Sequence, residues 1–212
     1  MGQSSDQLLQ VAASLQENPL GGLGFKRKRL RFVRELPDVY WIVQFQRGPP
    51  MRWSAMHGQF CMEWGIEVKG IGELAGYYRP REPCTGACTL RMRVGALADG
   101  HDHWWPSPKN DQQAVATAAA LREILVHHEI PYLERFRDAS SVCAWMEDVC
   151  AGRIHWQPPG NGPPAFGLEL ACLYHQLGET EKARARFAIE FDTDPTARFV
   201  PHLNAVRRRL GY

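Results

Sequence analysis

The 212-residue sequence lacks the features that mark membrane-bound, secreted and DNA-coating proteins. No apolar run approaches the roughly 20 residues that a membrane-spanning helix needs. The first residues lack the cationic and apolar segments of a secretory signal. The formal net charge of +2 excludes general coating of DNA, although it is compatible with a local basic patch. We therefore expect a cytoplasmic protein that makes no contact with a membrane.

Common catalytic motifs are also absent. The sequence contains no Gly-x-Ser-x-Gly elbow, no phosphate-binding Gly-x4-Gly-Lys-Ser/Thr loop and no His-Glu-x2-His zinc motif. Glu63 and Glu67 share one predicted strand and would lie about 13 Å apart, which is too far for a glycosidase pair. An enzyme is therefore unsupported, and we predict no catalytic residue.

The six cysteines leave disulfides, a metal site or simple packing open. Disulfides are not expected without a secretory signal. Cys84-x3-Cys88 lacks the tight, paired Cys-x2-Cys spacing that zinc sites favour. We therefore expect buried thiols, no metal and no cofactor.

His101-Asp102-His103 is a weak candidate for a metal site, or for a base that is held by its aspartate. A metal would need a third ligand from elsewhere, such as Cys84, Cys88 or His57. The alternative is a solvated loop before a tryptophan pair that anchors on the core. We favour this second interpretation.

The spacing of apolar residues predicts an α+β fold with a mainly antiparallel sheet of four or more strands flanked by helices. A helix is expected first, over residues 5–17. Hairpin-length links between the first three strands indicate antiparallel pairing. The expected strands cover residues 25–35, 39–47, 59–68 and, as a short candidate, 89–94.

After residue 106 the pattern becomes helical, and a linker rich in proline and glycine interrupts it at residues 157–164. We therefore expect an α+β domain over residues 1–152 and a C-terminal helical segment over residues 165–212. The expected helices cover residues 111–128, 140–150, 166–177, 180–191 and 200–210.

The C-terminal helices carry a rhythm of small and large residues, namely Leu170-Ala171, Tyr174, Leu177-Gly178, Lys182-Ala183 and Phe187. This rhythm resembles one tetratricopeptide repeat, which implies a TPR-like helical hairpin, followed here by one more helix. A single repeat cannot bury its own apolar face. We therefore expect the hairpin to pack on the N-terminal domain.

The strongest functional signal is a basic strand over residues 26–34, which contains six Lys and Arg residues and no Asp or Glu. As one continuous strand, it has its basic residues on two faces: Arg27, Arg29 and Arg31 on one, and Lys26, Lys28 and Arg34 on the other. Residues of one face repeat about every 6.8 Å, which suits an acidic protein surface or nucleic-acid phosphates. Alternatively, the strand is a solvated sheet edge whose like charges prevent aggregation. We predict that these six residues bind a partner.

Further motifs follow one another between residues 5 and 148: Gly24-Phe25-Lys26-Arg27-Lys28, Val43-Gln44-Phe45-Gln46, Trp64-Gly65-Ile66, Leu90-Arg91-Met92-Arg93-Val94-Gly95, Asp102-His103-Trp104-Trp105 and Ile130-Pro131-Tyr132-Leu133. Their order resembles the domain of unknown function 4304 family. The resemblance implies an α+β fold with a mainly antiparallel sheet followed by helices. It implies no catalytic residues, because that family has no established activity. It also links the chain with bacterial proteins that work beside toxin or secretion systems.

Together these features predict a non-enzymatic protein that binds another protein. The most specific form of this prediction is a bacterial immunity protein, which neutralises a toxin, or a secretion-system accessory protein. The expected partner is then a toxin or an effector. The first alternative is a nucleic-acid-binding protein that uses the basic strand 26–34. The second is a small enzyme that uses the loop of His101, Asp102 and His103.

Overall fold

The computed structural model describes residues 3–76, 82–154, 166–193 and 200–211. A six-stranded antiparallel sheet has the strand order β1-β2-β3-β4-β5, and β6 pairs with β4. The strands are β1 (Lys26–Lys28), β2 (Arg31–Glu35), β3 (Val39–Arg47), β4 (Gln59–Val68), β5 (Leu90–Arg93) and β6 (Trp105–Pro106). The predicted α+β fold with a mainly antiparallel sheet is confirmed.

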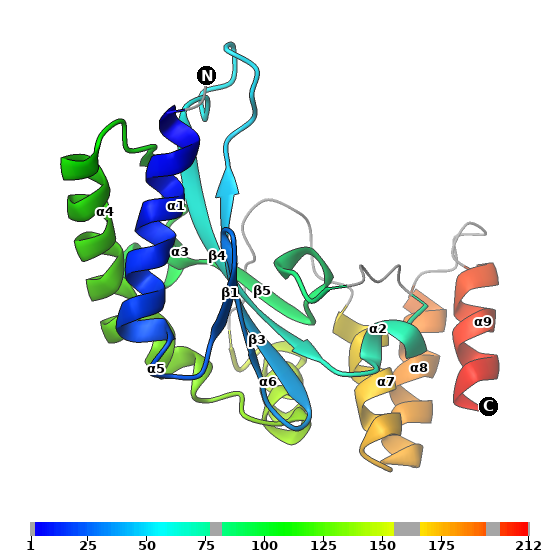
Figure 1. Cartoon of the computed structure of the whole chain (residues 1–212). Coiled ribbons are helices and arrows are strands. Elements are labelled where there is room, and N and C mark those ends of the chain that lie inside the picture. Colours follow the sequence, from blue (N-terminus) through cyan, green and yellow to red (C-terminus); the bar gives the residue numbers. More distant parts are fainter. Residues whose placement is uncertain (1–2, 77–81, 155–165, 194–199, 212) are drawn as a thin grey trace.

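Helices lie before, between and after the strands (Figure 1). The longer ones are α1 (Gln3–Leu15), α4 (Asp111–Ile124), α6 (Ala139–Cys150), α7 (Phe166–Gln176), α8 (Thr180–Thr193) and α9 (Val200–Leu210). The short ones are α2 (Ile71–Leu74), α3 (Val94–Asp99), α5 (Ile130–Leu133), the π-helical turns η1 (Gln16–Leu20) and η3 (Leu125–Glu129), and the 3-10 turn η2 (Thr85–Ala87). Helices α2 and α3 and strand β6 are too short for a periodic pattern, so the sequence did not predict them.

The two long central strands, β3 and β4, direct apolar side chains to one face of the sheet, because successive side chains of a strand alternate between faces. Trp41 lies opposite Ile66, and Val43 lies opposite Trp64. All four side chains are buried. We call this side of the sheet the apolar face. The same alternation made the bounds of both strands predictable, and both predictions are confirmed.

Helices pack over the apolar face, and α1 runs beside α4 on that side of the sheet (Figure 1). The Trp64 ring lies 5.2 Å from the ring of Tyr132 in α5. The indole N–H of Trp41 donates a 2.7 Å hydrogen bond to the carbonyl oxygen of Phe136. This bond satisfies the one polar group of a fully buried tryptophan. The core therefore lies between the sheet and this helical layer.

The prediction of one strand over residues 25–35 is wrong. The segment forms a hairpin in which Lys28 lies opposite Arg31 and Arg27 lies opposite Phe32. Arg29 and Leu30 make the two-residue turn, and Arg29 has a φ of 57°. Such turns usually contain Gly, Asn or Asp, and without them nothing in the local sequence marks the reversal. The predicted common face of three arginines therefore does not form.

The C-terminal helices pack on the rest of the chain. Helix α7 lies against α8, α6 and α2, and α9 lies against α2. The Phe166 ring meets the Trp145 ring edge-on at 6.1 Å, and the Tyr174 hydroxyl donates a 2.6 Å hydrogen bond to Glu147. The expected linker lies outside the described residues. The likeness to a tetratricopeptide repeat and the division into two domains stay predictions.

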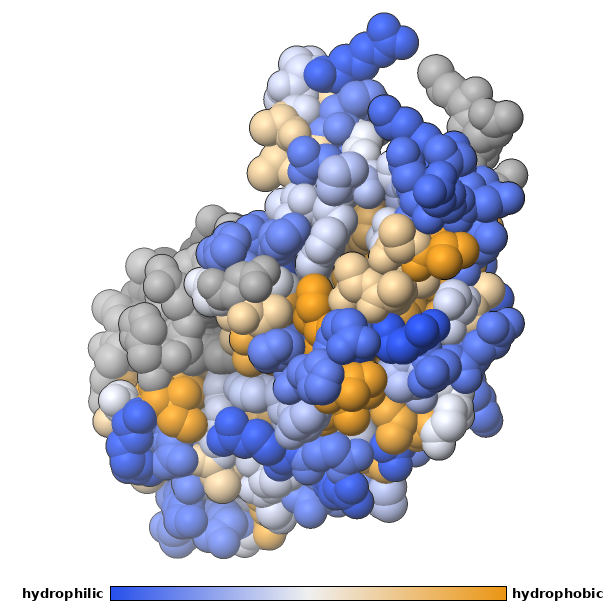
Figure 2. Space-filling model, turned by 90° about the vertical axis from the view of Figure 1, so that its left-hand side faces the viewer, coloured by the Kyte–Doolittle hydropathy of each residue, from blue (hydrophilic) through white to orange (hydrophobic). Residues whose placement is uncertain are grey.

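The molecular surface on the α4 side is largely hydrophilic, with small apolar patches between the polar residues (Figure 2). Val115 and Val126 are among the large apolar side chains that are exposed. Within the described segments, none of the helices combines the length and the apolar character that crossing a bilayer requires.

Candidate functional site

The second face of the sheet carries a row of polar side chains that crosses five strands. Successive partners in this row are Lys28, Arg31, Gln44, Glu63 and Arg93. Alternation along each strand puts them on the side opposite the apolar face. We call this side the polar face. Cations occupy both of its edges, and a carboxylate lies near its centre.

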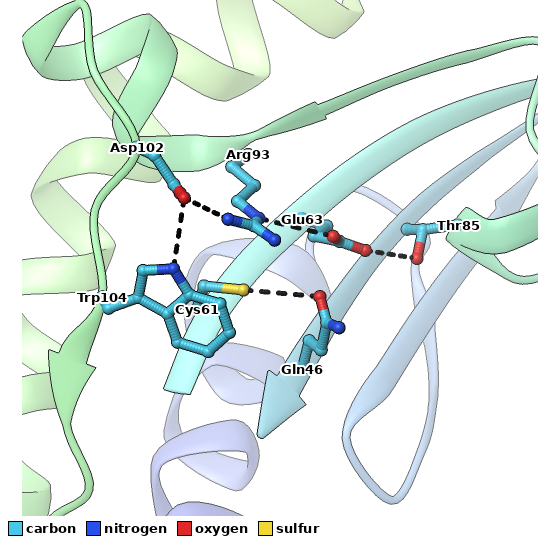
Figure 3. Close-up of polar contacts among 7 residues, drawn as sticks. All are labelled: Gln46, Cys61, Glu63, Thr85, Arg93, Asp102 and Trp104. Carbon is cyan, nitrogen blue, oxygen red and sulfur yellow. Dashed lines mark hydrogen bonds and ion pairs between the residues drawn. The ribbon is translucent and has the colours of Figure 1, made fainter. Parts of the chain in front are cut away.

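Residues 82–89, here called the covering segment, lie over the middle of the polar face, where η2 contacts β3 and β4. The Thr85 hydroxyl donates a 2.9 Å hydrogen bond to the Glu63 carboxylate (Figure 3). A Cβ atom on Gly65 would lie 2.3 Å from the Cys88 sulfur. Only glycine allows this close approach. The covering segment is thus fixed to the sheet at two points.

Glu63 is buried, and its charge is paired. Its carboxylate lies 3.7 Å from Nε of Arg93, which also forms an ion pair with Asp102. The indole N–H of Trp104 donates a 3.2 Å hydrogen bond to the same Asp102 carboxylate (Figure 3). The Arg93 guanidinium also lies 4.9 Å from the centre of the Trp104 ring. Each charge in this cluster has an opposite charge or a hydrogen-bond donor beside it. The cluster is therefore suited to holding β5 and the loop of Asp102 and Trp104 on the sheet.

Thiols on this face are poor nucleophiles. Cys61 donates a 3.6 Å hydrogen bond to the Gln46 side chain, and burial raises the pKa of its thiol to about 12. Burial also raises the pKa of the Cys88 thiol well above its usual value. The thiolate is the reactive form, so both sulfurs are unreactive at neutral pH. The expectation of buried thiols holds for Cys61, Cys143 and Cys172, but Cys84 and Cys88 are half-buried, and Cys150 is exposed at the end of α6.

The weak metal candidates His101 and His103 lie in a stack of rings. Their ring centres are 6.1 Å apart, and the His103 ring stacks on Trp105 at 4.3 Å. The intervening Asp102 binds Arg93. In the part of the chain that the structure describes, no three His, Cys, Asp or Glu side chains gather where they could hold a metal ion.

The six predicted partner-binding residues lie in the hairpin of β1, its turn and β2, here called the cationic hairpin (residues 26–34). The hairpin forms one edge of the sheet. It borders an open hollow of about 580 Å³. The lining residues of the hollow are Gly24, Lys26, Arg27, Lys28, Arg31, Val33, Glu35, Tyr40, Glu82 and Pro83. Four of the six predicted cations therefore line one space, although the register puts the Arg27 side chain on the side of Phe32, opposite to Lys28 and Arg31.

The remaining two predicted cations lie elsewhere. Arg34 is turned toward the helical layer, where it lies 3.6 Å from Glu134 and 4.7 Å from the centre of the Trp41 ring. Arg29 occupies the turn, and its carbonyl oxygen accepts a 3.1 Å hydrogen bond from Arg27. Arg34 therefore stabilises the packing of β2 on the helical layer, on the side away from the hollow.

The cations of the hairpin differ in their partners. Lys28 and Arg31 both form ion pairs with Glu82. Lys26, Arg27 and Arg29 form no ion pair with a carboxylate in the described parts of the chain. A carboxylate from another molecule can reach these three without displacing an internal one.

The loop between β3 and β4 is a feature that the sequence reasoning missed. It projects from the end of the sheet (Figure 1) and exposes three large apolar side chains. Trp53 is 84% exposed, Met51 42% and Met56 37%. We call these three residues the apolar tip. The sequence signal was the group of apolar residues after Pro49-Pro50, in a stretch without Asp or Glu.

Hydrogen bonds within the loop hold the apolar tip in place. The Ser54 N–H donates to the Met51 carbonyl oxygen, and the His57 N–H donates to the Ser54 carbonyl oxygen, both at 3.0 Å. The Phe45 N–H, near the end of β3, donates a 2.9 Å hydrogen bond to the carbonyl oxygen of Leu30 in the hairpin turn. The cationic hairpin and the base of the loop therefore lie at the same end of the sheet.

Comparison with known proteins places the chain in a family but gives it no activity. No curated protein matches it, and no solved structure matches it. One family model, described as Domain of unknown function (DUF4304), matches residues 16–135. This range includes every strand of the sheet and helix α4, and it ends before α6. Since the match covers more than half of the sequence, the chain belongs to the Domain of unknown function (DUF4304) family.

Proposed function

We propose that this chain is a non-enzymatic protein that binds an acidic surface of a protein partner through the cationic hairpin. The observation that carries the proposal is a group of exposed cations, Lys26, Arg27 and Arg29, that form no ion pair with a carboxylate of the described residues. Lys26 and Arg27 line the open hollow, and Arg29 lies in the hairpin turn. Carboxylates of a partner supply the missing counter-charges, and guanidinium groups bind them through two parallel hydrogen bonds.

The apolar tip favours a protein partner over nucleic acid. Trp, Met and Arg are enriched at the centres of protein interfaces, and the loop combines Trp53 and Met51 with Arg52. Its internal hydrogen bonds lower the entropy that the loop loses on binding. A partner with an apolar pocket next to acidic residues fits both the tip and the hairpin.

The narrower form of the proposal is a toxin-neutralising (immunity) or secretion-accessory role. The resemblance in the sequence motifs implies it, and the exposed cationic hairpin and apolar tip are compatible with it. The partner would then be a toxin or an effector with an acidic surface. Nucleic-acid binding through the same cations is the competing function.

Fluorescently labelled poly-L-glutamate tests the hairpin by titration at low salt, with fluorescence anisotropy as the measurement. We expect the double variant Arg27→Glu/Arg29→Glu to bind about tenfold more weakly, because it loses two attractions and gains two repulsions. The matched control is Arg207→Glu/Arg208→Glu, which makes the same charge change at exposed positions of α9. The control should bind as the unaltered chain does.

Two further probes separate the partner classes. A copolymer of glutamate and tyrosine should bind more tightly than poly-L-glutamate, and Trp53→Ser should remove only this gain. A short DNA duplex should bind more weakly than either polymer. Tighter and steeply salt-dependent DNA binding would favour the nucleic-acid function. Equal losses in the hairpin and control variants would contradict a specific contact surface.

A further inference from the structure

The cationic hairpin already holds one carboxylate. The two oxygens of Glu82 are divided between two cations: Oε1 accepts from Lys28, and Oε2 lies 2.5 Å from a terminal nitrogen of Arg31. Lys28 and Arg31 lie opposite each other on the two strands of the hairpin. Their side chains therefore converge on the same side of the sheet and form a site with the shape and charge of a carboxylate clamp.

The covering segment positions Glu82 at this site. Three residues after Glu82, Thr85 is fixed to Glu63 by a 2.9 Å hydrogen bond. Next along the segment, the Cys88 thiol donates a 3.4 Å hydrogen bond to the Cys84 carbonyl oxygen. The chain around Glu82 is thus anchored on the polar face, and its carboxylate is kept close to the two cations at a high local concentration.

Another carboxylate can nevertheless replace Glu82 in its ion pairs with Lys28 and Arg31. The side chains of Lys28 and Glu82 are 68% and 46% exposed, so water screens their attraction. The hydrogen bond from Lys28 holds the pKa of Glu82 below its usual value, with Arg31 adding to the effect. Glu82 is therefore charged at neutral pH and resembles the carboxylate of an acidic protein.

We propose that Lys28 and Arg31 form a carboxylate-binding site, and that Glu82 is an internal competitor displaced by an Asp or Glu side chain of the partner. This inference rests on the proposed function and adds the chemistry of one contact point and its regulation. Exchange of one carboxylate for another yields little net affinity. Affinity then depends on Lys26, Arg27 and Arg29, which form no ion pair with a carboxylate of the described residues. The site therefore selects surfaces with several carboxylates over isolated ones.

Three variants test the displacement with labelled poly-L-glutamate. Glu82→Gln should bind about fivefold more tightly, the largest effect expected for loss of one exposed ion pair. Glu82→Asp keeps the charge but shortens the side chain, and it should also bind more tightly. Glu35→Gln is the matched control, because Glu35 lines the same hollow but pairs with Lys69. Its affinity should change less than twofold, by our order-of-magnitude expectation for a screened charge.

The outcomes separate this inference from the proposed function. If Glu82→Gln and Glu82→Asp leave affinity unchanged while Arg27→Glu/Arg29→Glu still weakens binding, displacement is wrong and the binding function stands. If Glu82→Gln tightens binding but Glu82→Asp does not, net charge is the cause and displacement is wrong. If the hairpin variant binds normally, the proposed function itself fails. Circular dichroism checks that each variant is folded.

Discussion

The two faces of the sheet are buried in different ways. On the apolar face, residues such as Trp41 and Trp64 are fully buried beneath a layer of helices. On the polar face, Glu63 is buried beneath the short covering segment and is paired with Arg93 and Thr85. Large apolar area stabilises the first arrangement. The second is stable only while every charge keeps its partner.

A buried carboxyl group in the helical layer makes the contrast sharper. Glu129, the last residue of η3, has no exposed surface, and neither of its oxygens has a hydrogen-bond partner among the described residues. Burial alone raises the pKa of this carboxyl well above its usual value. Glu63 is therefore a satisfied charge, whereas Glu129 is a polar group whose burial destabilises the fold.

The largest effect is expected from the apolar face. Trp41→Ala removes a buried ring that lies 6.4 Å from Phe25 and also removes the hydrogen bond to Phe136. The free energy of unfolding should fall by about 3–5 kcal/mol, as is usual for truncation of a buried tryptophan. Urea denaturation measures this change. Trp53→Ala, at the exposed apolar tip, is the control and should alter stability by less than about 0.5 kcal/mol.

An intermediate effect is expected from the polar face. Arg93→Met leaves Glu63 and Asp102 without their shared cation, and stability should fall by about 2–3 kcal/mol because both pairs are partly screened. Adding Glu63→Gln should recover part of this loss, since the uncompensated charge is gone. Urea denaturation of the two single variants and the double variant gives the coupling energy. Additive effects would show that Arg93 acts through packing rather than charge.

An effect of opposite sign, which fades at low pH, is expected at Glu129. The folded chain keeps the Glu129 proton to a higher pH than the unfolded chain, whose carboxyl titrates near 4.5. Above that pH the unfolded state binds fewer protons, so the free energy of unfolding falls by about 1.4 kcal/mol per pH unit until the folded group also ionises. Glu129→Gln lacks this titration. It should therefore be more stable than the unaltered chain at pH 7, by a margin that widens with pH until the folded carboxyl ionises.

Stability curves from pH 4 to pH 8 check the Glu129 prediction. The difference in the free energy of unfolding between Glu129→Gln and the unaltered chain should be small at pH 4, where the carboxyl is largely protonated in both the folded and the unfolded chain. This difference should widen as the pH rises. Glu63→Gln serves as the comparison at the satisfied carboxylate and should destabilise the chain at pH 7. A constant gap at Glu129 across the range would show that its carboxyl titrates alike in both states.

The sequence alone determined the elements with long, regular patterns. Apolar and polar residues alternate through 39–47 and 59–68, and helical spacing runs through 111–128, because packing of one side against the apolar core imposes a period on each element. It also placed the chain in its family and located a cationic segment. Local pattern was sufficient because these features depend on residues that are close together in the chain.

Only the tertiary structure decided how the charges are arranged. The reversal at Arg29 separates cations that a single strand would align, and no local residue marks it. Glu82 reaches Lys28 across 54 positions of sequence, and Arg93 reaches Glu63 across neighbouring strands. Such pairs depend on strand order and on the path of the covering segment. Charged residues carry no period that would reveal those partners before the chain has folded, because paired and solvated charges look the same in a sequence.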